Sequence, residues 1–399
     1  MIPIRPVDIL LPSNADYEKW AVVACDQFTS QKDYWQSLDE LVGSAPSTLR
    51  LIYPEVYLGE ADYEKRIEDI QKTMRKYLED GVFEEYKNCC VLVKRSTAFG
   101  NQRLGIVLGV DLEEYCFTHP SHASVRSTED VVASRIPPRV KIRRGAPLEL
   151  PHVILLLDDE NKSVIESLVS ADREVLYDFD LNMQGGHITG YKVSADEITE
   201  RMNEYVSRKL GEGKDFLVAV GDGNHSLATA QAYWNEIRET LTEEERKTHP
   251  ARIALCEVEN LYDEGIIFEP IHRFVFGADE SLIEFLESRL SGNLSVKTTV
   301  NGVERNVFVP DNSAQAISAV QSVLEEYTSQ HKECSIDYIH GEDNLKEIAA
   351  ANAGVALFMP SMKKDELFSY VSEHGTLCKK TFSMGEAQEK RYYIEAKRI

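Results

Sequence analysis

The sequence feature that most constrains the fold is a short apolar run that enters a glycine loop between two helical patterns. Residues 215–220 are compact and apolar, which predicts a buried strand. Before them, Ser194 and Glu197 form a capping-box pattern that predicts a helix over about 195–210. After the loop, residues 227–239 have the composition of a second helix. A helix, a strand, a loop and a helix in succession are typical of a mixed α/β protein.

Helical and strand patterns alternate through most of the chain and indicate the same fold class. Further elements are expected as helices at 60–80, 161–170, 242–248, 279–292 and 313–328, and as strands at 20–26, 89–95, 103–112, 152–158, 173–180, 187–193, 252–258, 265–268, 294–300 and 306–309. Single cores stop growing at roughly 250–300 residues, so a chain of 399 residues suggests more than one domain. Because the pattern restarts near residue 277, we expect a main body at 1–276 and a smaller αβ region at 277–399.

Composition and charge disfavour several classes of function. The formal net charge of −23 opposes binding to nucleic acid, which depends on Lys and Arg contacts to phosphates. No apolar run approaches the ~18 residues of a membrane span, and the first residues do not resemble a signal peptide. The seven cysteines include no C-x-x-C pair, which fits a reducing compartment. We therefore expect a cytoplasmic protein with no membrane partner and no nucleic-acid partner.

The glycine loop has the chemistry of an anion site, and its residues are Gly221, Asp222, Gly223, Asn224, His225 and Ser226. Glycine allows a positive φ and a close approach of a ligand. The first N–H groups of the following helix lack internal partners and, with the helix dipole, attract anions. His225 can donate to a phosphate or move a proton, Asp222 can hold a metal or a sugar hydroxyl, and Ser226 can cap the helix. A purely structural turn between strand and helix is the alternative that these residues leave open.

Five segments carry a resemblance to a known family. Asp222-Gly223-Asn224-His225-Ser226 is similar to a D-G-H-H-R motif, and residues 4–6, 20–27, 126–129 and 270–273 are similar to other family segments. On these residues the whole chain resembles the domain-of-unknown-function family 1015. That family is distantly similar to the superfamily of ParB proteins, sulfiredoxins and free-serine kinases. The resemblance implies a ParB/sulfiredoxin-like mixed-sheet core and a smaller C-terminal αβ segment.

The resemblance also implies a site in which the loop contacts nucleotide phosphates. Catalytic roles are implied for Glu129 and His225. Nucleotide contacts are implied for the six loop residues and for Arg126, His272 and Arg273. A magnesium ion would bind near Asp222 and Glu129.

The loop departs from the family motif at two positions. Asn224 replaces the first His of the motif, and Ser226 replaces its Arg. The lost Arg removes a bidentate ligand for phosphate. We therefore expect the missing cation to come from Arg126, Arg273 or the basic segment 139–144.

These features predict a nucleotide-dependent phosphotransferase that acts on a small hydroxyl compound such as an amino acid. Its cofactors would be ATP, ADP or CTP, together with magnesium. The alternative is a non-catalytic nucleotide-binding switch or adaptor, in which the long, weakly periodic segment 118–151 reorders on binding. Glu129 also fits a solvated carboxylate, and Asp26, after a buried strand, fits a helix cap. The substrate, the choice of nucleotide and the oligomeric state are left open.

Overall fold

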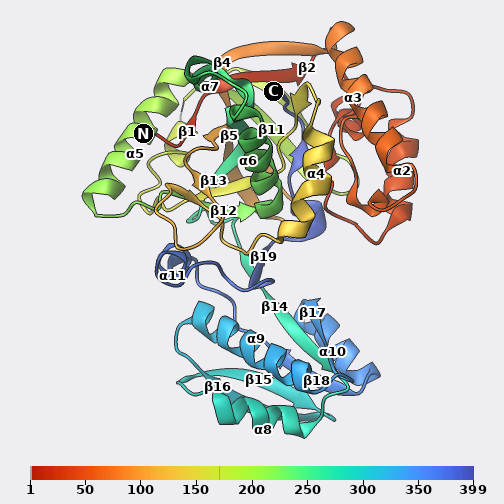
Figure 1. Ribbon diagram of the computed structural model, residues 1–399, viewed down its shortest axis with the longest axis vertical. Coiled ribbons are helices and arrows are strands. Elements are labelled where there is room, and N and C mark those ends of the chain that lie inside the picture. The colour runs from red at the N-terminus through yellow and green to blue at the C-terminus, as the bar shows by residue number, and fades with distance from the viewer. Residues whose placement is uncertain (1, 170) are drawn as a thin grey trace. The chain divides into compact units, whose positions relative to one another are not determined.

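The computed structural model describes residues 2–169 and 171–399 and consists of two compact units (Figure 1). The first unit contains the chain up to Ile266 together with Glu386–Ile399, and the second unit is Ile267–Gly385. The expected division between 276 and 277 differs from this one. β14 (Phe268–Phe276) pairs with strands of the second unit, so its hydrogen bonds place it there. The C-terminal segment Glu386–Ile399 returns to the first unit.

A large mixed sheet forms the centre of the first unit. Within the described residues it has eleven strands in the order β10-β11-β4-β5-β13-β9-β12-β7-β6, with β1 paired to β5 and β2 to β4. The strands are β1 (Ile4–Arg5), β2 (Val7–Pro12), β4 (Phe83–Ser96), β5 (Gln102–Asp111), β6 (Tyr115–Cys116), β7 (Val125–Arg126), β9 (Ile154–Leu157), β10 (Val175–Leu181), β11 (Gly186–Ser194), β12 (Val218–Asp222) and β13 (Ile253–Asn260). β13 pairs with β9, β12 with β7, and β7 with β6 in parallel; the other pairs are antiparallel. The fold class is mixed α/β, which confirms the prediction.

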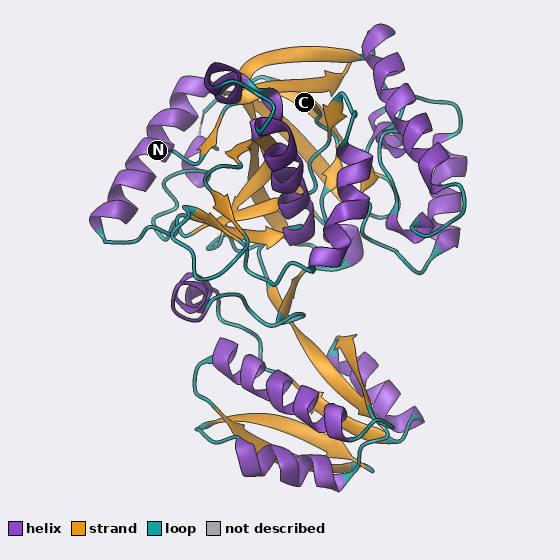
Figure 2. Ribbon diagram, viewed as in Figure 1, coloured by secondary structure: helices purple, strands orange, loops and turns teal. Residues whose placement is uncertain are grey.

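This sheet is buried on both faces because its central strands are apolar on both sides. In β4, Cys90 and Leu92 belong to one core, whereas Val91 and Val93 belong to another. The first core includes residues of α5 (Ala195–Gly211) and α6 (Asn224–Arg238). The second core includes residues of α2 (Lys32–Val42), β3 (Val22–Val23) and β20 (Tyr392–Tyr393). Helices therefore cover the sheet from two sides (Figure 2).

Smaller elements complete the first unit. They are α1 (Tyr17–Trp20), α3 (Tyr63–Glu79), α4 (Ile136–Arg143), α7 (Glu243–Thr248), and the paired strands β8 (Leu148–Glu149) and β21 (Lys397–Arg398). α3 lies within the helix expected at 60–80 and buries Ile67, Ile70, Met74 and Tyr77. α4 packs beside α6, and this contact brings part of the long segment 118–151 next to the glycine loop.

Several local predictions are confirmed by their capping hydrogen bonds. The Ser194 side chain accepts from the Glu197 N–H at the start of α5, and Thr242 and Glu245 form a complete capping box at α7. The strand expected at 265–268 begins only at Phe268. Gly265 N–H instead donates to the Asp263 carboxylate in a turn, at 2.7 Å.

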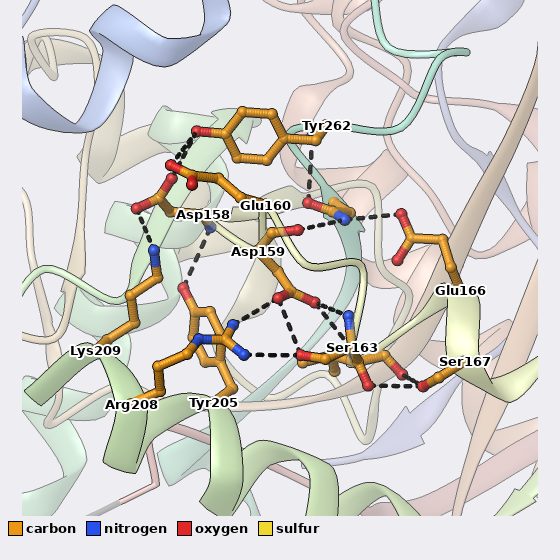
Figure 3. A network of polar contacts seen from close by, with 12 residues as sticks. Asp158, Asp159, Glu160, Ser163, Glu166, Ser167, Tyr205, Arg208, Lys209 and Tyr262 are labelled. Carbon is orange, nitrogen blue, oxygen red and sulfur yellow. Dashed lines mark hydrogen bonds and ion pairs between the residues drawn. The ribbon is translucent and has the colours of Figure 1, made fainter. Parts of the chain in front are cut away.

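The helix expected at 161–170 is wrong, and residue 170 lies outside the described residues. The helical part is a 3-10 turn at Glu166–Leu168. The Asp159 carboxylate accepts from the N–H groups of Ser163, at 2.6 Å, and Val164, at 2.9 Å. The Asp159 side chain thus provides the hydrogen-bond acceptor for two backbone N–H groups that would lack a partner at the start of a helix. Arg208 of α5 binds the same carboxylate, which anchors the turn (Figure 3).

The second unit has its own antiparallel sheet, in the order β16-β15-β18-β14-β17, with β19 paired to the start of β14. Its other elements are α8 (Glu280–Arg289), β15 (Leu294–Val300), β16 (Val303–Val309), α9 (Ser313–Gln330), β17 (Ser335–His340), α10 (Glu342–Ala351), β18 (Gly354–Phe358), α11 (Leu367–His374) and β19 (Phe382–Met384). Among the helices of the described chain, none has the length and apolarity that a membrane crossing requires.

Candidate functional site

The glycine loop lies where β12 of the central sheet passes directly into α6. β12 ends at Asp222, and α6 begins at Asn224, three residues earlier than the sequence pattern indicates. Gly223 is the N-cap, with a left-handed φ of 83°. The N–H groups of Asn224 and His225 have no backbone acceptor within the described residues. The start of α6 therefore presents free amide donors at the positive end of a 15-residue helix.

Gly223 is required by space as well as by φ. A Cβ at this position would lie 3.1 Å from both Cα and Cγ2 of Val153. Val153 precedes β9, whose Ile154 pairs with Asp222. The loop is thus pressed against the chain that enters the neighbouring strand.

Asn224 holds the long segment 118–151 against the loop. Its Oδ1 accepts from Ser127 Oγ at 2.6 Å and from Thr128 N–H at 3.1 Å, and the residue is 7% exposed. The Ser127 hydroxyl is in turn within 2.7 Å of the Glu129 carbonyl oxygen. The Asn that replaces the motif His therefore fixes the backbone that carries Glu129, and Glu129 itself is partly buried.

His225 is tied to the same segment by its imidazole. Its Nε2 accepts from Val132 N–H at 3.1 Å, so the neutral ring carries its proton on Nδ1. Burial lowers the pKa of His225, and the charges of Arg135 and Arg139 lower it further, while Asp26 acts in the opposite direction. His225 is therefore a neutral acceptor that faces cationic side chains.

Two arginines bring positive charge to the loop from the start of α4. Arg139 lies in the basic segment considered above, and its Nε donates to Glu55 at 3.0 Å. Arg135 is exposed, and its guanidinium has no ion pair within the described part of the chain. Both residues act electrostatically on His225. Arg135 and Arg139 are therefore candidates for the cation that the loop lacks.

Arg126 is engaged at the opposite end of β12. Its Nη2 pairs with Asp215 Oδ1 at 2.6 Å, and its Nε donates to the Ala123 carbonyl at 2.8 Å. The guanidinium lies over the Phe216 ring, 4.8 Å from its centroid. These contacts hold Arg126 before β12 begins, whereas the glycine loop follows its end.

Asp222 is paired with a residue from the C-terminal segment. Its Oδ2 lies 3.2 Å from Lys390 Nζ, and its Oδ1 accepts from Gly223 N–H at 2.9 Å. Burial alone would raise the pKa of Asp222, but Lys390 and, when its ring is protonated, the nearby His152 hold it below its ordinary value. Asp222 is therefore a carboxylate with one ammonium partner.

A magnesium ion would obtain few ligands from the protein itself. Among the described residues, no group of three or more His, Cys, Asp or Glu side chains is arranged to hold a metal. Magnesium usually binds through one or two carboxylates together with phosphates and water.

His272 and Arg273 lie on β14 and are engaged inside the second unit. Met359 N–H donates to His272 Nδ1 at 3.1 Å. Arg273 is fully buried, and its guanidinium donates to Gln321 Oε1 and to the carbonyl oxygen of Lys380, each at 3.0 Å. Both side chains thus have structural partners of their own.

Sequence reasoning missed His152, Arg135, Lys390 and Tyr393. Tyr393 Oη lies 2.8 Å from His152 Nδ1, beside the chain that presses on Gly223. Three of these residues lie outside any motif, and two come from the C-terminal segment that was expected in another region. Only Arg135, next to the basic segment, had a neighbouring signal in the sequence.

Comparison with known proteins gives a family and a set of distant structural neighbours. The family model described as "Protein of unknown function (DUF1015)" matches residues 4–397. No curated protein matches the chain significantly. A free serine kinase in complex with AMP has 10% identity and a TM-score of 0.37, over 68% of this chain and 85% of that chain. SbnI with a C-terminal truncation, from Staphylococcus aureus, has 11% identity and a TM-score of 0.36, over 72% and 82%. A conserved hypothetical protein from Pyrococcus furiosus has 11% identity and a TM-score of 0.35, over 70% and 92%.

Proposed function

We propose that this chain, which belongs to the DUF1015 family of proteins of unknown function, is a nucleotide-dependent phosphotransferase whose phosphate site is the start of α6. The observation that carries the proposal is that the free N–H groups at the start of α6 and the charges of Arg135 and Arg139 lie on the side of His225. Gly223 leaves the first N–H groups of α6 unobstructed, and Arg135 and Arg139 add positive charge on the same side as His225. Backbone donors and cations together are what a phosphate group requires.

The transfer reaction can be assigned to residues of this site. The oxygen of an acceptor hydroxyl attacks phosphorus while the bond from phosphorus to the leaving phosphate oxygen breaks. Glu129 would take the hydroxyl proton, because Asn224 holds its backbone beside the loop. The α6 amides and Arg135 would stabilise the charge on the transferred group. Asp222, together with Glu129, would hold the magnesium of the nucleotide.

Nucleotide binding is tested by calorimetry with ATP, ADP and CTP, with and without magnesium. Arg135→Ala removes an exposed cation that has no ion pair in the described chain, so the fold should be unaffected. We expect affinity to fall about tenfold, which corresponds to ~1.4 kcal/mol for one charge-assisted contact. Arg144→Ala is the matched control, because Arg144 is exposed in the same basic segment and pairs with Glu236 at 2.8 Å. Its affinity should equal that of the parent.

Catalysis is tested by incubating each nucleotide that binds with magnesium and a panel of hydroxyl amino acids and other small alcohols. Transfer of phosphate to one acceptor, abolished by Glu129→Gln, supports the proposal. Absence of nucleotide binding up to millimolar concentration contradicts it altogether.

One observation favours a non-catalytic switch as the second candidate. Val132 N–H donates to Nε2 of His225, and Thr128 N–H donates to Oδ1 of Asn224. His225 can donate to a phosphate through Nε2 only if the Val132 contact breaks. A phosphate that accepts a hydrogen bond from His225 Nε2 would therefore release the backbone of segment 118–151 at Val132. Nucleotide binding that changes hydrogen exchange there, with no turnover on any acceptor, would support the switch over the phosphotransferase.

A further inference from the structure

Three residues from distant parts of the first unit form a hydrogen-bonded chain beside the glycine loop. Cys25 N–H donates to Tyr393 Oη at 3.2 Å, and Tyr393 Oη lies 2.8 Å from His152 Nδ1. The two rings meet edge to face, with centroids 5.6 Å apart and an interplanar angle of 82°. Tyr393 is 2% exposed, whereas His152 is only partly buried. The buried tyrosine is thus a fixed support for a histidine that reaches solvent.

The hydrogen bonds around Tyr393 are compatible with a His152 ring that is protonated on Nε2. Tyr393 Oη accepts from the Cys25 amide and retains one proton, which it can donate to His152 Nδ1 or to the Cys25 side chain. A neutral imidazole that accepts at Nδ1 carries its own proton at Nε2. No partner of Nε2 is found among the described residues. In the Nε2-protonated form, His152 presents an unused N–H donor.

The backbone on both sides of His152 is clamped. Arg391 Nε donates to the Pro151 carbonyl at 3.1 Å, and Glu257 N–H donates to the Val153 carbonyl at 3.0 Å. Val153 is also the residue that packs on Gly223. The imidazole is therefore held in place by its chain and by Tyr393, within electrostatic reach of Asp222.

We propose that His152 is a second imidazole of the phosphate site, whose Nε2–H donates to an oxygen of the bound phosphoryl group. Tyr393 is a positioning residue that selects the Nε2-protonated form. This inference rests on the proposed function, because it assigns a donor to the ligand that the α6 amides bind. It complements His225, whose Nε2 is an acceptor occupied by Val132 in the same structure.

The inference is tested first by nitrogen-15 NMR of the imidazoles in the full chain, without any substitution. The spectrum should show His152 protonated on Nε2, and this signal should shift when inorganic phosphate or ADP is added. Because the measurement uses the parent protein, it does not depend on whether a variant folds. A His152 protonated on Nδ1, or one that does not respond while His225 does, overturns the inference and leaves the proposed function intact. If neither histidine responds and no ligand binds, the proposed function fails as well.

Variants then separate a ligand contact from a structural role. We expect His152→Ala to weaken ADP about tenfold and His152→Gln, which keeps an N–H donor, to weaken it no more than about threefold. Tyr393→Phe should weaken ADP severalfold and produce a mixture of His152 tautomers. Tyr392→Phe is the matched control, because Tyr392 is equally buried on β20 but its hydroxyl donates to the Asn182 carbonyl at 3.0 Å. Equal ADP affinity in His152→Ala and the parent overturns the inference, even if melting temperatures change.

Discussion

At Gly223, the absence of a side chain decides whether β12 can pass directly into α6. The residue combines a φ of 83° with a Cβ position that lies 3.1 Å from Val153. A left-handed conformation costs a residue with a Cβ about 1 kcal/mol or more. The close contact with Val153 adds to that cost, because a backbone atom cannot rotate away.

Gly223→Ala should therefore lower stability by about 1–3 kcal/mol, measured as a shift of the denaturation midpoint. It should also weaken phosphate binding, because the α6 amides move with the loop. Gly211→Ala is the control: Gly211 ends α5, has no positive φ, and would have no atom within 4 Å of its new Cβ. That variant should be neutral or slightly more stable. Equal stability of the two variants would show that the Gly223 conformation is not required.

At the scale of elements, the contact between His225 of α6 and Val132 makes segment 118–151 sensitive to pH. Burial and two arginines lower the pKa of His225 in the folded protein. A lowered pKa means that the folded state favours the neutral ring. The resulting stabilisation is present above the ordinary histidine value of about 6.5 and is lost as pH falls through the lowered value. A protonated Nε2 can no longer accept from Val132.

Acidification should therefore reduce the hydrogen-exchange protection factor of the Val132 amide. The Thr128 amide is an internal control in the same segment, since it donates to the Asn224 side chain, which does not titrate. Protection at Thr128 should stay constant over the pH range in which protection at Val132 falls. Parallel loss at both amides would mean that the whole segment opens for another reason.

At the scale of the whole molecule, the C-terminal segment holds the first unit together through buried ion pairs. The Arg391 guanidinium is bound to Glu257 of β13 and, at 2.5 Å, to Glu395, and all three side chains are at most 3% exposed. Removing one partner of such a group leaves uncompensated buried charge. We expect the pairs to be essential to the stability of a unit whose strands come from both ends of the chain.

Arg391→Met should lower the free energy of unfolding by about 3–5 kcal/mol, measured by chemical denaturation. Arg398→Met in the same segment is the control, because the Arg398 side chain is 54% exposed and its ion pair with Glu85 is long, at 3.8 Å. An exposed pair contributes about 0–1 kcal/mol. If the two variants were equally stable, the C-terminal segment would not depend on its buried charges.

The sequence by itself determined many of the elements and the place of the glycine loop, but not α2 or α4. Apolar spacing predicts α3 and the strands β4 and β5, and the capping-box pattern of Ser194 and Glu197 predicts α5. These features depend on neighbours within a few residues, so local patterns are sufficient. The helix expected at 161–170 is wrong because the Asp159 carboxylate, held by Arg208, accepts from the backbone N–H groups of this segment, an interaction that helical spacing does not encode.

The tertiary structure alone decided which residues surround the loop. His152, Lys390 and Tyr393 reach it from separate parts of the chain, because the sheet places the entry to β9 beside the end of β12 and the C-terminal segment returns to the first unit. Arg126 and Arg273, which the sequence offers as replacements for the missing cation, are instead bound to Asp215 and to partners in the second unit. A sequence shows which side chains can bind a phosphate; only their partners in space determine which of them are free to do so.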